Sequence, residues 1–490
     1  MFRLSQKKLH AQYRRLAFMV VIVLFAGVGT AFIHLSHAAT ACTTTVNSVA
    51  TAQTAVTNAA NGDTICMAAG TYSSSINLSS SHTANVTFEP DPTQDPSGAG
   101  KVTFAGINIT GNYLTVRNFY SNGGITINSG GSNDVIDHND VSQAICGFGI
   151  AVYGTFSGST FTAVATNDVI SGNRIHDTGD SAGGCEADAL RIQGYKNLTI
   201  TGNELFNIKE CPTNNCHTDT LQSYQADVQT SGLDIEKNYI HDTTDAQGFP
   251  FLKDGDVQDV TIKDNLSLRM ADAGETTGAI IFENSTAHNN AYGIIMENNT
   301  YLTPGSIQMQ GSAANPSADV DHNVFDVFNA FNGIYPTFVH QNNDYLVLES
   351  SPGQLSSLSA SETSFEGKSM PAFKCGSSCN SLAATPFACN ATCSNLNKTG
   401  DDYELATNPN GLGIDWSPAT QTYGPVSGSG SGGGTTVTGD LNGDGHVNIF
   451  DLSIFLSHWQ QSGTGLPEDF NNDGVVNIFD LSILLSHYGA

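Results

Sequence analysis

Positively charged side chains are scarce in this 490-residue sequence: 18 Lys and Arg stand against 46 Asp and Glu, for a formal charge of −28. Such a surface repels nucleic acid and anionic lipid and attracts divalent cations. Charged residues of both signs make up only 13% of the chain, which also contains 50 glycines. Asn, Ser, Thr and Gly must therefore build most of the surface. This composition argues against a nucleic-acid partner and suits a β-rich extracellular protein.

The first 38 residues have the order of an export signal. Five cations precede a run without charge from Leu16 to Ile33, and the small-residue site Ser36-His37-Ala38 follows. This order is typical of a secretory signal peptide, so we expect a secreted protein, extracellular or attached to the cell surface. A retained membrane anchor is the alternative, because the run is about long enough to span a bilayer.

Ten cysteines, an even number, fit an oxidising compartment in which thiols pair. Cys42 and Cys66 flank the first structural unit, in which a short amphipathic helix at 47–60 precedes a strand and a turn, and they are candidates to staple it. Four further cysteines at 375–393 have a C-x3-C spacing that departs from a zinc ribbon, so disulfides are favoured there over zinc.

A repeat begins near residue 85. A pair of β-branched or Leu residues is followed by an Asn, and successive Asn positions lie 21 to 35 residues apart, too irregular for leucine-rich or propeller repeats. A solenoid of short strands joined by variable loops explains the spread, with the turn Asn stacked in a hydrogen-bonded ladder. The expected ladder positions are Asn118, Asn139, Asn173, Asn203, Asn238, Asn265, Asn298 and Asn323.

This pattern resembles the pectin-lyase-like right-handed parallel β-helix family, and Gly70-Thr71-Tyr72 looks like part of its N-terminal cap. The resemblance implies an all-β solenoid that processes or binds polysaccharide. The sequence lacks the Arg-x-Pro-x-x-Arg motif of pectate lyases and the Gly-His-Gly motif of polygalacturonases, so the reaction type stays open. The expected boundaries are a signal peptide at 1–38, an N-terminal cap at 39–84, the β-helix at 85–340, final coils with a Cys-rich cap at 341–424, a Gly/Ser linker at 425–438, and a last domain at 439–490.

The last domain contains two copies of a calcium-loop pattern that begin 29 residues apart. Each copy puts oxygen-bearing side chains at loop positions 1, 3, 5, 9 and 12 and Gly at position 6, with a backbone carbonyl at position 7, as in EF-hands. The expected ligands of two Ca²⁺ ions are Asp440, Asn442, Asp444, His446, Asn448, Asp451, Asp469, Asn471, Asp473, Val475, Asn477 and Asp480.

Asp at position 12 and a single helix after each loop resemble a type I dockerin. That resemblance implies a small all-α domain that folds on calcium and binds a cohesin module of a scaffold or surface protein. Ile449, Phe450, Ile478 and Phe479 would lie near the docking surface, and Ile-Phe at both places, where Ser-Thr is common, implies a different cohesin specificity. The alternative is a pair of calcium-stabilised helices that merely cap the chain.

Candidate site residues come from three segments that align without a gap, 146–152, 185–191 and 216–222. If Leu190 and Leu221 point inward, strand alternation turns Arg191 and Gln222 outward. Stacked coils lie about 4.8 Å apart, which brings Asp188 and Asp219 within about 5 Å of one another. The insertions 153–167, 176–187 and 207–217 would wall a groove.

The following segment, Phe251-Leu252-Lys253-Asp254, fits as the next coil with Lys253 outward. One hypothesis is a calcium-assisted lyase on a uronate-containing glycan: Asp188 and Asp219 hold one Ca²⁺ in the groove, Arg191 pairs with substrate, and Lys253 or His217 removes the C5 proton.

Two alternatives remain. A glycoside hydrolase would use Asp188 and Asp219 as its carboxyl pair, at a spacing nearer to that of retaining enzymes. A non-catalytic adhesin would hold glycan with the same residues without breaking it. The negative charge of the protein counts against the lyase, because an acidic polymer approaches such a surface only if calcium bridges the two or the groove is locally positive, whereas a neutral glycan avoids the problem.

Overall fold

A computed structural model describes the chain over the following residues: 41–94, 102–128, 130–142, 147–157, 160–178, 187–208, 218–224, 229–241, 243, 249–253, 256–268, 280–283, 291–301, 307–310, 318–328, 338–348, 359–364, 414–417, 422–425, 455, 459, 470–471 and 474–487. The expected signal segment lies outside these residues. Among the helices they form, none is long and apolar enough to cross a membrane. The chain divides into two compact units, a larger one that includes Ala41–Thr436 and a smaller one that includes His446–Ala490.

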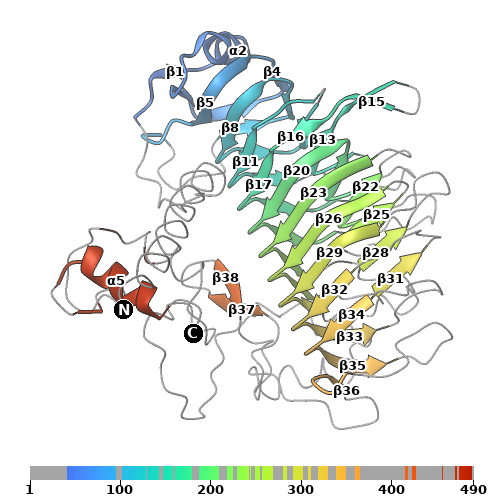
Figure 1. Cartoon of the computed structure of the whole chain (residues 1–490). Coiled ribbons are helices and arrows are strands. Elements are labelled where there is room, and N and C mark those ends of the chain that lie inside the picture. The colour runs from blue at the N-terminus through green and yellow to red at the C-terminus, as the bar shows by residue number, and fades with distance from the viewer. Residues whose placement is uncertain are drawn as a thin grey trace, which may run out of the picture. The chain divides into compact units, whose positions relative to one another are not determined.

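Three sheets of parallel strands build the larger unit (Figure 1), and over most of its length the chain visits them in turn, so a typical coil adds one strand to each sheet. The first sheet, sheet A, consists of β1 (Thr44–Val46), β2 (Thr64–Met67), β5 (Ser81–Pro90), β8 (Asn112–Arg117), β11 (Val135–Asp137), β16 (Ala165–Thr166), β17 (Val169–Ser171), β20 (Tyr195–Thr201), β23 (Gln229–Glu236), β26 (Asp256–Lys263), β29 (Ala291–Glu297), β32 (Ala318–Asp321) and β34 (Phe338–Gln341).

Sheet B consists of β3 (Gly70–Tyr72), β6 (Val102–Phe104), β9 (Tyr120–Ser121), β12 (Asp140–Ser142), β18 (Arg174–His176), β21 (Glu204–Phe206), β24 (Tyr239–His241), β27 (Leu266–Leu268), β30 (Thr300–Tyr301), β33 (Val324–Phe328), β35 (Asp344–Leu348) and β36 (Thr363–Ser364). Sheet C consists of β4 (Ile76–Leu78), β7 (Ile107–Ile109), β10 (Ile125–Ile127), β13 (Ile150–Tyr153), β19 (Leu190–Gln193), β22 (Leu221–Tyr224), β25 (Phe251–Lys253), β28 (Ile280–Glu283) and β31 (Ile307–Gln310). This is the expected parallel β-helix, and right-handed crossovers are the rule for parallel strands.

Stacks of identical or similar apolar side chains form the core. In sheet A, Ile136, Ile170, Ile200, Ile235 and Ile262 lie in register on consecutive strands and are fully buried. β-branched side chains suit such a stack because they pack well on a pleated surface and have few rotamers to lose. The repeat seen in the sequence is therefore the inward row of one sheet.

The N-terminal unit forms as the sequence predicts. Helix α2 (Val49–Asn58) begins at the capping residue Ser48, whose side chain accepts a hydrogen bond from the backbone of Thr51, and it buries Ala52 and Val56. The expected Cys42–Cys66 disulfide is confirmed. It closes a loop over the first coil, where a solenoid has no preceding neighbour to cover it. The other eight cysteines lie outside the described residues.

An asparagine ladder runs along the turn between sheets A and B. Each ladder Asn donates from Nδ2 to Oδ1 of the next, at 2.9–3.0 Å, and that Oδ1 also accepts the backbone N–H of the first. Nδ2 also reaches a carbonyl of the preceding coil, so the buried amide is satisfied. The members are Asn139, Asn173, Asn203, Asn238, Asn265, Asn299, Asn323 and Asn343.

Two of the predicted ladder positions are wrong. Asn118 and Asn298 adopt φ values of 63° and 55°, in the left-handed turn position that precedes the ladder residue. Phe119 and Asn299 occupy the ladder positions of these coils. Asn tolerates the left-handed conformation better than most residues, so the turn uses Asn at both places and the sequence alone does not separate them.

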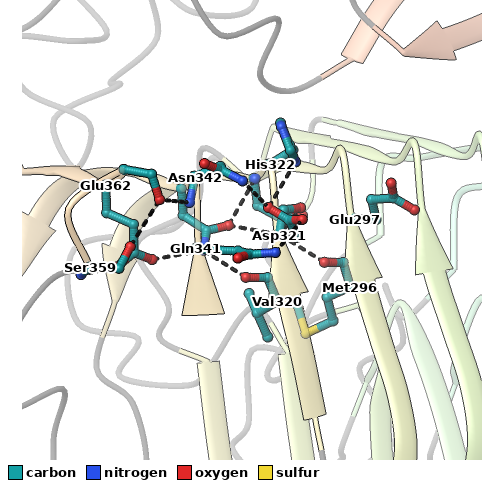
Figure 2. A network of polar contacts seen from close by, with 12 residues as sticks. Met296, Glu297, Val320, Asp321, His322, Gln341, Asn342, Ser359 and Glu362 are labelled. Carbon is teal, nitrogen blue, oxygen red and sulfur yellow. Dashed lines mark hydrogen bonds and ion pairs between the residues drawn. The ribbon is translucent and has the colours of Figure 1, made fainter. Parts of the chain in front are cut away.

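The ladder ends on a carboxylate, Glu362 (Figure 2). Glu362 accepts hydrogen bonds from Asn343 Nδ2 (2.9 Å), His340 Nδ1 (2.7 Å) and the backbone N–H of Ser359 (2.8 Å), and its side chain is fully buried. A carboxylate only accepts hydrogen bonds, so it has no donor to pass to a further coil. Beyond it the larger unit has one more described element, an antiparallel pair of β37 (Ile414–Ser417) and β38 (Thr422–Pro425).

Candidate functional site

The outward-facing side of sheet C carries the candidate site residues. Strand pairing puts Arg191 beside Gln222 and Gln222 beside Phe251 on three consecutive coils. Leu190 and Leu221 point inward and are fully buried, as the strand alternation of the sequence predicts. The row of Arg191, Gln222 and Phe251 therefore lies on the outer face.

Asp188 and Asp219 lie next to each other where β19 and β22 begin. The backbone N–H of Asp219 donates to Oδ1 of Asp188 at 2.9 Å, and both side chains are fully buried. The structure thus brings the two carboxyls together on adjacent coils, beneath the outer face and out of contact with solvent.

Arg191 is held by one of these carboxyls. Its Nη1 donates to Oδ2 of Asp188 at 2.8 Å, while its guanidinium lies 5.1 Å from the ring centre of Phe148. The Phe148 ring in turn meets Tyr153 edge to face, with 6.4 Å between ring centres. With 13% of its side chain exposed, Arg191 presents a fixed cation to solvent at the floor of the outer face. A guanidinium fixed in this way loses little entropy when it binds a ligand.

Gln222 holds the second carboxyl in the same manner. Its Nε2 donates to Oδ2 of Asp219 at 2.5 Å, and only 3% of the residue is exposed. The pattern repeats from coil to coil: a buried Asp accepts a hydrogen bond from the side chain three residues later in the same strand segment.

The pKa of Asp188 is raised to about 7: burial and the negative field of Asp219 raise it, and the ion pair with Arg191 lowers it. Two adjacent carboxyls that are shielded from water cannot both ionise without cost. Around neutral pH the two carboxyls therefore do not both carry a negative charge, and the guanidinium of Arg191 balances the charge that is present.

These carboxyls fit a calcium ion poorly. Ca²⁺ takes six to eight oxygen ligands, whereas the Asp188 oxygens accept hydrogen bonds from an amide and a guanidinium, and a fixed cation already lies against them. Among the described residues no group of three or more His, Cys, Asp or Glu has the arrangement of a metal site. We therefore derive no step through a groove-bound calcium.

Two expectations about register are corrected. The segment at 146–152 is offset by one residue, because Ile150 pairs with Leu190 where the gapless alignment pairs it with Ala189. Lys253 pairs with Tyr224 and Glu283, two residues farther along the strand than Gln222. A shift of two residues leaves the alternation that the sequence predicts for this strand unchanged, because side chains alternate with a period of two. His217 lies outside the described residues.

Phe148 and Tyr153 were missed from the sequence. Phe148 is at the coil position that Asp188 has on the next coil, as the hydrogen bond from Gly149 N–H to the Asp188 carbonyl shows. An alignment that places Ile150 opposite Leu190 also places Phe148 opposite Asp188 and so identifies it as a neighbour of Arg191. Tyr153 begins an outward row that continues through Gln193.

In the smaller unit, helix α5 (Ile478–Ser486) follows the second expected calcium loop. Asp480, at loop position 12, is fully buried and accepts hydrogen bonds from the backbone of Asn471 (3.1 Å) and Asn477 (3.0 Å). Gly474, at position 6, has φ = 88°, the left-handed conformation that the sharp turn of such a loop requires. The turn at Gly474 and the carboxyl of Asp480 thus lie at the loop positions that the sequence assigns to them. Eight of the expected ligands lie outside the described residues.

Residues 478 and 479 are the most exposed large apolar side chains of α5, with 58% of Ile478 and 67% of Phe479 accessible. The opposite face of α5 packs Leu484 against Phe455 and Val476. An apolar pair in the first helical turn thus points to solvent while the helix has a core of its own.

Comparison with known proteins finds one family match and several similar folds. Residues 438–487 match the type I dockerin domain. No curated protein matches the chain. Solved structures similar to it include an alginate lyase from Paenibacillus sp. (15% identity, 63% of this chain and 100% of the other, TM-score 0.41) and a pectate lyase (13%, 74% and 87%, 0.38). A surface adhesin of Streptococcus pneumoniae is also similar (12%, 61% and 75%, 0.36).

Proposed function

We propose that this chain is an exported protein that acts on a uronate-containing polysaccharide along sheet C and is attached to a scaffold or cell surface through its dockerin. The observation that carries the proposal is Arg191, a partly exposed cation fixed between a buried carboxyl and an aromatic ring on a strongly acidic protein. A fixed guanidinium matches the bidentate geometry of a sugar carboxylate. It also supplies the locally positive point that an acidic polymer needs.

In the lyase form of this proposal, Arg191 binds the uronate carboxylate and withdraws electron density from it, which makes the adjacent C5 proton more acidic. A base then removes that proton, a double bond forms between C4 and C5, and the C4–O bond breaks as the leaving oxygen takes a proton. Lys253 is the proposed base, on the outer side of the sheet two coils away from Arg191. Its amine would have to be neutral, which burial against bound substrate would favour.

The hydrolase alternative has less support. A carboxyl acid or nucleophile must come within hydrogen-bond distance of the glycosidic bond, and Asp188 and Asp219 are fully buried beneath Arg191 and Gln222. The same burial favours a second candidate function, a glycan-binding protein that holds acidic polymer through Arg191 without breaking it.

Turnover of a panel of acidic and neutral polysaccharides separates these functions, with unsaturated-product absorbance and reducing ends followed together. A lyase gives both signals, and both fall in Arg191→Ala and Lys253→Ala. The matched control is Arg174→Ala, an exposed arginine on sheet B that pairs with Glu204 and Asp140. Reducing ends without absorbance would mean hydrolysis and would contradict the lyase, and no product at all with retained binding would favour the adhesin.

For the smaller unit we propose that Ca²⁺ held by the dockerin loops orders α5 and the helix expected after the first loop. We also propose that Ile478 and Phe479 contact the cohesin partner. Exposed apolar and aromatic side chains are typical anchors of an interface. Phe479→Ala, alone and with Phe450→Ala at the equivalent position of the first copy, should abolish binding to a cohesin that the wild type recognises. Ser482→Ala, an exposed change on the same helix, is the control. Unchanged binding by the double variant would contradict this surface.

A further inference from the structure

Two buried carboxylic acids lie at the turn before sheet A, at the opposite end of its strands from the Asn ladder. Strand register in sheet A puts Asp134 beside Leu114 and Asp168 beside Leu198, with the two acids next to each other. This row is otherwise aliphatic: Val86, Leu114, Leu198, Leu233, Val260 and Ile294. Both acids are 0–1% exposed, and neither takes part in the site on sheet C.

Their hydrogen bonds repeat those of the Asn ladder. In the ladder, Phe119 N–H donates to Asn139 Oδ1, and Asn139 N–H donates to Asn173 Oδ1. At the turn before sheet A, Leu114 N–H donates to Asp134 Oδ1, and Asp134 N–H donates to Asp168 Oδ1, both at 2.9 Å. In both cases the preceding residue, Asn118 or Tyr113, has a left-handed φ of about 60°. The acids therefore hold ladder positions.

The difference lies in the second side-chain atom. Asn139 Nδ2 donates to the carbonyl of Val116, three residues before Phe119. The equivalent carbonyl for Asp134 is that of Gly111, and a Cβ on Gly131 would lie 2.8 Å from Asp134 Oδ2 and 3.0 Å from Gly111 O. Asp134 Oδ2 and the Gly111 carbonyl therefore border the same space beside Gly131, on the side where the ladder Asn has its donor.

Among the described residues, no donor forms a hydrogen bond to Oδ2 of Asp134 or Asp168. A carboxyl oxygen in such a place, shielded from water, is far less costly as part of a neutral acid than as an unpaired buried charge. We propose that Asp134 is a protonated stand-in for Asn: its carboxyl group donates from Oδ2, and with Asp168 it forms a second, acid-dependent ladder in the solenoid.

The electrostatic surroundings agree with this assignment. The pKa of Asp134 is raised to about 8: burial raises it most, the hydrogen bond from the Leu114 N–H lowers it, and the neighbouring Asp168 raises it. Burial likewise raises the pKa of Asp168 to about 7. Because both folded-state values exceed that of a free Asp, the folded chain binds more protons than the unfolded one between pH about 4 and 8, and stability falls as pH rises through this window.

The test measures thermal unfolding of the full chain with calcium from pH 5 to 9, for wild type, Asp134→Asn and Asp259→Asn. Asp259 is an exposed carboxylate at a left-handed turn, so its variant removes the same charge outside the core. We expect the midpoint of wild type and Asp259→Asn to fall by several degrees between pH 6 and 9, and that of Asp134→Asn to fall less, because only the other buried acids still titrate there.

An infrared difference spectrum between wild type and Asp134→Asn at pH 7 gives a readout that does not depend on unfolding. We expect wild type to show the carbonyl stretch of a protonated carboxylic acid that the variant lacks. A carboxylate band in its place, or the same pH slope in Asp134→Asn and wild type, would overturn the proposal.

Discussion

Arg191 is the residue on which the proposed function rests, and its chemistry is set by groups that never reach solvent. Asp188 orients it from below and Phe148 stacks on it from the preceding coil. The sequence predicts Arg191 as outward because strand alternation is a local property. It does not predict the aromatic neighbour, because the insertion between the two coils varies in length and a gapless alignment places Phe148 one residue away from its true partner.

Asp188→Asn tests the coupling of this site to pH. Burial keeps the proton on folded Asp188 up to about pH 7, so the folded state binds more protons than the unfolded state from pH about 4 to 7. Stability is highest at the acidic end of that window and falls as pH rises. Urea unfolding at pH 5 and 8 should show a smaller pH difference in Asp188→Asn than in wild type, and an equal difference would contradict the raised pKa.

At the scale of elements, the ladder turns and the inward strand rows are the parts that sequence predicts well. A buried polar residue every coil, after a β-branched pair, has few structural explanations. Positions one residue off, such as Asn118 and Asn298, arise because the same residue type suits a left-handed turn. Lys253 pairs two residues beyond Gln222, because alternation predicts which face of a strand a side chain takes and does not predict the register between strands.

A central ladder residue should be costly to remove. Asn203→Leu deletes the bonds to the Ile170 carbonyl and Asn238 and leaves the buried N–H of Asn173 unpaired. We expect a loss of about 2–4 kcal/mol in the free energy of unfolding, measured in urea. Asn108→Ala, which removes one amide contact with Asn77 on the outside of sheet C, should cost less than about 1 kcal/mol.

The carboxylate that ends the ladder should act locally. Glu362→Ala leaves buried donors on His340, Asn343 and Ser359 without their acceptor (Figure 2). Hydrogen exchange should quicken at β34 and β35 and stay unchanged at β11, because each coil contacts only its neighbours. Equal quickening at both ends would mean that the whole solenoid responds as one unit.

At the scale of the molecule, the chain joins a solenoid with a complete core to a small domain that is expected to need metal. The buried core of the smaller unit includes only Phe455, Val476 and Leu484 among the described residues. A domain of about 50 residues has little apolar surface to bury, and domains of this size commonly draw stability from a metal or a disulfide. The two domain types were both predictable because each repeats a motif, whereas the glycan and the reaction are not written in any repeated pattern.

Chelation of calcium should therefore separate the two units. We expect a chelator to abolish the helical circular-dichroism signal of the dockerin and its unfolding transition, while the transition of the β-helix stays within about 2 °C, since its described residues hold no calcium-like cluster. A large fall in the unfolding temperature of the β-helix on chelation would indicate a calcium ion in the solenoid.

The most direct test of the account is the affinity of the full chain for acidic and neutral oligosaccharides, measured by titration calorimetry with Arg191→Ala and Arg174→Ala in parallel. The account predicts that Arg191→Ala weakens binding of a uronate oligosaccharide about tenfold to a hundredfold, as expected for a lost charged hydrogen bond, while Arg174→Ala binds like wild type. Equal affinity of Arg191→Ala and wild type for every acidic ligand would contradict a glycan site on sheet C.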